Sequence, residues 1–182
     1  MIYIIELLRY HDDLCENIIK MNQTHIHLLI THLPIFGSIL GGLVLAHGLW
    51  TKSNQTKIAA YNLFIISAIG AVVAYLTGEG AEETVENMQG VVEATIKTHE
   101  EFALFALISL IILGVAALIG LFLTLRKSSL TRAVAIIILF ISLISFGLVA
   151  RTGYLGGQIR HTEINASNNP NLTPNENEGE DD

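Results

Sequence analysis

Two histidines, His32 and His99, stand just before long apolar stretches of the sequence. A neutral imidazole binds haem iron or a metal ion through one ring nitrogen. Pro34 either kinks a helix or occupies its first turn, and in the second case His32 lies at the membrane interface, at the same depth as His99. We expect the two residues on neighbouring antiparallel helices. The sequence therefore predicts that His32 and His99 are the two axial ligands of a b-type haem.

The same histidines are also suited to a metal site completed by carboxylates. The candidate metal ligands are His32, His99, Glu79, Glu83 and His161. Ligating imidazoles are usually held by a second acceptor, so we expect supporting residues around the ligands. These are Glu82, Glu100 and Arg151.

Polar side chains at helix ends also have simpler roles. His25, His27 and His161 are more simply explained by hydrogen bonds to backbone groups or by contacts with lipid headgroups. For His32 and His99, the structural and the ligand-binding explanations both stay open. Arg151 can reach lipid phosphates or form an ion pair with Glu79 across the mouth of the bundle.

Four apolar stretches position these residues. Apolar residues make up 51% of the 182 positions and charged residues 15%, which indicates a membrane protein. Each stretch is long enough to cross the hydrocarbon layer as a helix. A helix forms its backbone hydrogen bonds internally, which is required where no water can bind the N–H and C=O groups. The predicted spans are 28–50, 58–77, 102–125 and 133–150. The predicted fold is an all-α bundle of four transmembrane helices covering residues 21–161.

The basic residues predict the orientation of the bundle. The loop after the first span contains Lys52 and Lys57, and the loop after the third contains Arg126, Lys127 and Arg132, without an acid in either. Such loops face the cytoplasm, so both termini should lie on the outer side of the membrane. The expected membrane is the cytoplasmic (inner) membrane of a bacterium.

Small residues predict where helices approach closely. Gly37 and Gly41 are four residues apart in the first span, and Gly42 follows directly. This spacing places glycines on one side of the helix, where a neighbouring backbone can come near.

The two ends of the chain differ from the bundle. Residues 1–20 lack the basic start and long apolar core of a signal peptide, and Met21 opens a run that leads directly into the first span. We interpret 1–20 as an extension ahead of a native start at Met21, with a short interfacial helix as the alternative. Residues 162–182 are rich in Asn and acids, which predicts a disordered tail.

Several functions are disfavoured. Cys15 is the only cysteine, so an intrachain disulfide and thiolate clusters are excluded, and the net charge of −7 disfavours nucleic acid binding. The spans carry no mid-membrane ionisable residue, which disfavours a transporter. His47 stands near the opposite membrane face without a second histidine, which argues against a haem relay across the bilayer. No nucleophile or phosphate-loop motif appears, so an enzyme is disfavoured.

The chain resembles a bacterial family of four-helix membrane proteins classed as a domain of unknown function. The resemblance covers about residues 21–163 and rests on His-Leu-Pro at 32–34, Thr77 to Glu83, His99, and Gly-Tyr-Leu-Gly-Gly at 153–157. The segments around 77–83 and 156–163 look like the Bacteroidetes-type variant. Some relatives in this family are fused to cytochrome c-like domains, so the resemblance implies a redox role.

The sequence predicts an integral membrane protein with a His/Glu site at its outer face. It would bind haem b or a divalent metal and exchange electrons with a partner protein. The alternative is a non-catalytic membrane scaffold, or a subunit of a larger complex, whose polar mouth binds a partner protein. In both cases the lipid bilayer is the first partner of the chain.

Overall fold

The computed structural model describes residues 23–86 and 93–160, and all four predicted spans lie within long helices. The helices are α2 (His32–Trp50), α3 (Asn54–Glu86), α4 (Glu93–Leu125) and α5 (Thr131–Arg160). Each is long and apolar enough to cross a membrane. The prediction of an all-α bundle of four transmembrane helices is therefore confirmed. The predicted extension 1–20 and the tail 162–182 lie outside the described residues.

The helix of the first span begins earlier than we expected. Residues 23–30 are already helical, and a single turn residue, Thr31, separates them from α2. Pro34 lies in the first turn of α2, as expected, but a further helical segment precedes α2 across Thr31. Proline lacks a backbone N–H and crowds the preceding turn, which accounts for the interruption at Thr31.

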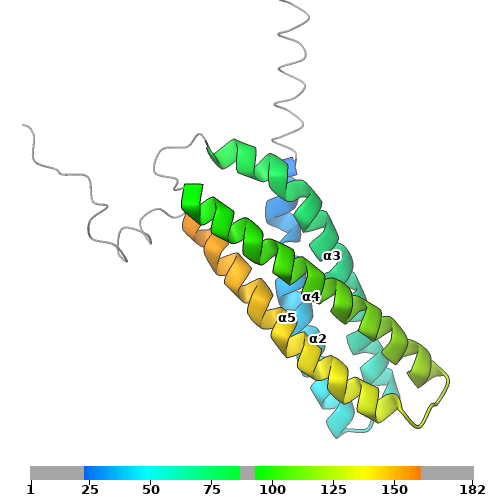
Figure 1. The fold of residues 1–182 in the computed structure, drawn as a ribbon. Coiled ribbons are helices and arrows are strands. Elements are labelled where there is room, and N and C mark those ends of the chain that lie inside the picture. The colour runs from blue at the N-terminus through cyan, green and yellow to red at the C-terminus, as the bar shows by residue number, and fades with distance from the viewer. Residues whose placement is uncertain (1–22, 87–92, 161–182) are drawn as a thin grey trace, which may run out of the picture.

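The four helices form a ring in chain order (Figure 1). α2 packs against α3 and α5, and α4 packs against the same two helices. α2 and α4 are therefore diagonal and run in the same direction, so the expectation that they are antiparallel neighbours is wrong. Residues of α2 and α4 that point into the bundle can therefore face each other across it.

Glycines determine how closely the helices pack. Gly41 lies against the fully buried ring of Phe64 on α3, and Gly37 lies against Ser67 one turn further along. The predicted glycine-bearing side of the first span is thus the side that α3 covers. The large exposed side chains, such as Leu43 and Phe140, cover the outside of the ring as a lipid-facing surface requires.

Three helices extend beyond their apolar stretches at one end of the bundle. α3 continues for nine residues past Thr77, α4 begins nine residues before Phe102, and α5 continues to Arg160. At a rise of 1.5 Å per residue these extensions reach roughly 13 Å beyond the predicted spans. His99 lies on such an extension, and we call this end of the molecule the histidine end.

Candidate functional site

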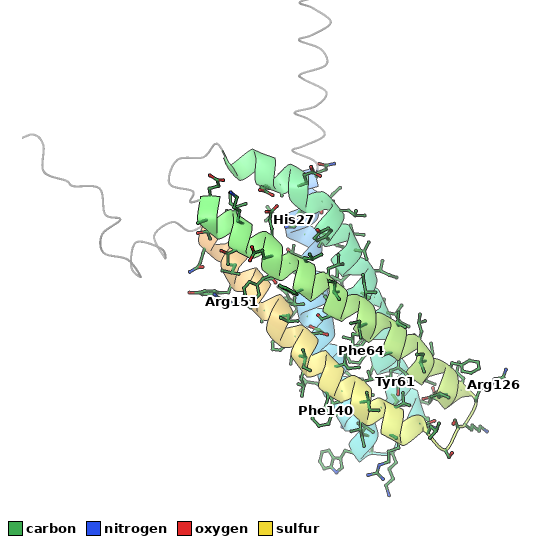
Figure 2. All side chains as sticks on the ribbon, in the orientation of Figure 1. His27, Tyr61, Phe64, Arg126, Phe140 and Arg151 are labelled. Carbon is green, nitrogen blue, oxygen red and sulfur yellow. The ribbon has the colours of Figure 1, made fainter. Side chains whose placement is uncertain are left out.

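His27 is held against α3 by its ring. Its Nδ1–H donates a hydrogen bond of 2.8 Å to the carbonyl oxygen of Ala74, and Thr77 Oγ1 lies 3.5 Å from the same nitrogen. A Cβ atom at position 78 would lie 3.6 Å from His27 Cε1, so Gly78 lets the imidazole approach the helix. Figure 2 shows His27 at the end of the bundle opposite Arg126.

His99 is held against α5 in the same way. Its Nδ1–H donates a hydrogen bond of 3.0 Å to the carbonyl oxygen of Thr152. A Cβ atom at position 156 would lie only 3.1 Å from His99 Cε1, closer than ordinary van der Waals contact. Gly156 is therefore the residue type that allows the ring to lie on the backbone of α5.

These hydrogen bonds determine the tautomer of both neutral imidazoles. A carbonyl oxygen can only accept, so Nδ1 carries the hydrogen in His27 and in His99. Nε2 then has its lone pair free in both residues. An Nδ1–H bonded to a backbone carbonyl is the usual support of a metal-ligating histidine, because it orients the ring and raises the basicity of Nε2.

The charge of His27 also acts on His99. His99 lies outside the charge-free part of α4, which begins at Phe102. Burial lowers the pKa of His99 below its ordinary value, and the charge of His27 lowers it further. The hydrogen bond to Thr152 and the charge of Glu100 act in the opposite direction and raise this pKa. Among the described histidines, His27 is the one whose charge acts on His99. The balance favours a neutral imidazole at His99, the form that binds metals.

His32, the predicted partner of His99, faces another direction. Its side chain is exposed, its Nδ1–H donates to the carbonyl oxygen of Leu28 in its own helix, and its ring stacks on Phe36 at a centroid distance of 6.4 Å. The Phe36 side chain is itself exposed on the outside of the four-helix bundle. His32 is therefore turned to the outside, whereas His27 lies near enough to His99 for its charge to act on that imidazole. His25 is exposed as well.

The predicted acidic ligands do not complete a metal site in the described part of the chain. Glu79 and Glu100 are exposed, and Glu82 is half-buried. The side chain of Glu83 and the whole of His161 lie outside the described residues. Within 23–86 and 93–160, the structure contains no group of three or more His, Cys, Asp or Glu side chains suited to a metal ion.

Arg151 contacts aromatic rings at the histidine end. Its guanidinium group lies 5.6 Å from the ring centroid of Phe102 and 5.4 Å from that of Tyr154. In the described residues, the ion pair with Glu79 that the sequence allowed is not formed, and Glu93–Lys97 is the pair present, at 2.7 Å. Arg151 is exposed, and cation–π contacts hold it at the outer surface of the bundle.

The importance of His27 could have been recognised from helical spacing. His27 lies seven residues before the buried Pro34, and a further seven residues lead to the buried Gly41 and then to Gly48. Two turns of helix return to nearly the same side, so His27 belongs to the side that faces the bundle. His32 shares its side with the exposed Phe36.

Comparison of the chain with protein-family models, with curated proteins and with solved structures finds no match.

Proposed function

We propose that this chain is a membrane-bound haem b protein that exchanges single electrons at the histidine end, with His27 and His99 as the axial ligands. The observation that carries the proposal is the shared tautomer. Two imidazoles from diagonal segments of the bundle each donate Nδ1–H to a backbone carbonyl and leave Nε2 free. In this proposal His27 takes the role that was predicted for His32.

The number of ligands favours a haem over a bare metal ion. A metal ion bound by protein alone needs three or four side chains, and the described residues offer no such group. A haem needs only two, because the porphyrin supplies the other four nitrogens. Four-helix bundles commonly hold cofactors between side chains on facing helices.

The glycines beside the two rings add to the fit. Gly78 and Gly156 let each imidazole lie against a neighbouring helix, which fixes both rings before any cofactor binds. A bound haem would supply one-electron chemistry. The protein would contribute the ligand basicity set by Ala74 and Thr152 and the low polarity of the bundle interior.

The location of the pair determines the kind of partner. Among the described residues, the opposite end offers a single histidine, His47, which is exposed and lies edge-on to Trp50. A single haem at the histidine end would exchange electrons with a redox protein on that side of the membrane. In our proposal this side is the outer face of a bacterial inner membrane, as the basic loops at the other end suggest.

The proposal is tested by the absorption spectrum of the purified protein in detergent. We expect a Soret band and, on reduction, the sharp α-band of a six-coordinate haem. His27→Ala and His99→Ala should each remove the six-coordinate spectrum. His32→Ala is the matched control, because it deletes an exposed imidazole five residues away, and it should leave the spectrum unchanged.

Two results would contradict the proposal. One is a protein without haem that also fails to bind added haemin, which would favour the scaffold alternative. The other is loss of the spectrum in His32→Ala with retention in His27→Ala, which would restore the pair predicted from the sequence.

A further inference from the structure

A buried lysine lies at the end of the bundle opposite the histidines. Lys57 is in the first turn of α3, and only 6% of its surface is exposed. A Cβ atom at position 48 would lie 3.1 Å from Lys57 Cγ, so Gly48 makes room on α2 for the lysine side chain. Lysine is among the residues least often buried unless it is paired.

The ammonium group of Lys57 has no partner among the described residues. It forms neither an ion pair nor a hydrogen bond there. The fully enclosed unpaired polar atoms of the described part are Tyr61 Oη and Ser67 Oγ, so Lys57 Nζ retains an opening to the outside. A cation that is covered by protein and still accessible at one point is suited to an anionic ligand.

Tyr61 adds a second enclosed polar group on the same side of α3, with Thr124 of α4 as its polar neighbour. Tyr61 lies four residues after Lys57, which is about one helical turn, and it is fully buried. Its ring lies close to Gly120 of α4. The interior at this end therefore contains a lysine ammonium without a partner among the described residues and, deeper in the bundle, an enclosed phenol beside Thr124.

The surrounding loops are basic and contain no acid. Together with the first turn of α5, they contain Lys52, Arg126, Lys127 and Arg132. Lys52 has a φ of 56° and Lys127 a φ of 54°, a conformation that favours glycine because a Cβ is crowded there. At both helix ends the chain thus has a positive charge where glycine would be less strained.

The depth of Lys57 matches that of lipid phosphates. The charge-free stretch 58–77 begins at the next residue, so Lys57 lies at the boundary between hydrocarbon and headgroups. Basic pockets between transmembrane helices at this boundary bind the headgroups of anionic lipids.

We propose that this end of the bundle binds the phosphate group of an anionic phospholipid, with Lys57 as the principal contact and the basic loops as its surroundings. This site is independent of the proposed haem. Phosphate is the shared chemistry of a lipid headgroup and free inorganic phosphate, and the position at the hydrocarbon boundary favours the lipid.

The test measures lipid binding to the purified full-length protein in phosphatidylcholine nanodiscs. Phosphatidylglycerol is titrated into the discs and the melting temperature is recorded, with inorganic phosphate titrated in parallel. We expect phosphatidylglycerol to stabilise the wild type. Lys57→Gln should weaken this binding about tenfold, the size of one charge-assisted hydrogen bond, and Lys57→Arg should retain most of it.

Lys52→Gln is the matched control, because it removes the same charge from an exposed position. It should weaken binding clearly less than Lys57→Gln. Equal losses in the two variants would overturn the proposal, since they would indicate general attraction between basic loops and an anionic surface. Absence of any preference for phosphatidylglycerol would overturn it too. Equal stabilisation by inorganic phosphate would overturn the lipid assignment.

Discussion

Replacement of Gly41 by alanine should separate α2 from α3. A Cβ atom at this position would lie 2.6 and 2.8 Å from two carbons of the Phe64 ring. Carbon atoms normally rest about 3.5–4.0 Å apart, so ring and backbone must move apart by about 1 Å. Phe64 is fully buried, which leaves its ring no open space to enter.

The expected loss of stability follows from this displacement. A gap of 0.5–1 Å removes a quarter to a half of the dispersion attraction between the surfaces that separate. Overpacking of this kind destabilises a protein by about 1–3 kcal/mol. We expect Gly41→Ala to fall in that range, because Gly37 and Gly48 contact α3 on the same side of α2 and would be drawn away with it.

Unfolding in mixed micelles of increasing dodecyl sulfate content, followed by circular dichroism, measures this free energy. Gly147→Ala is the control, since no atom lies within 4 Å of a Cβ at that position of α5. The control should be neutral or slightly stabilising because alanine favours helix. Phe64→Leu should partly rescue Gly41→Ala, with a double-mutant coupling above about 0.5 kcal/mol. Equal stabilities of Gly41→Ala and Gly147→Ala would refute the reasoning.

Two further predictions concern His99. Gly156→Ala places a methyl group 3.1 Å from the ring, so it should shift the haem spectrum or the reduction potential, and Gly157→Ala, which has open space around it, should not. Burial lowers the pKa of His99 in the folded protein below its ordinary value of 6.5. As the pH falls, His99 therefore becomes protonated in the unfolded chain at a higher pH than in the folded protein. The stability of the cofactor-free protein should therefore be constant above pH 6.5 and decrease below it. His99→Gln should flatten this dependence, and an unchanged slope in that variant would contradict the assignment.

The transmembrane architecture could be predicted from the sequence because it depends on local quantities. The absence of charge over about twenty residues is enough to require a helix in hydrocarbon, where no water satisfies the backbone. The presence of long helices over all four stretches follows from this requirement alone. Helix ends were less predictable. Polar segments beyond the membrane, such as the start of α4, continue as helix, whereas we based the spans on hydropathy.

The candidate site could be predicted only in part. The sequence indicated that histidines from the first and third helices lie near one end of the bundle, and His99 does face the interior there. His32 was favoured over His27 as a ligand, because Pro34 suggested that a new helix starts beside His32. In the structure the helix continues back to Gln23. His27 and His32 lie on different sides of this longer helix.

By itself, the sequence determined how many helices cross the membrane and which polar residues lie near each end, since both follow from composition along the chain. The tertiary structure decided which of those residues face each other. That choice depends on the rotation of each helix about its axis, and the rotation is set by the neighbour whose side chains fit its glycines. The fit of Gly37 and Gly41 to α3 directs His27 into the bundle and leaves His32 outside. The fit of Gly48 to Lys57 likewise covers a lysine that the sequence alone would assign to a solvated loop.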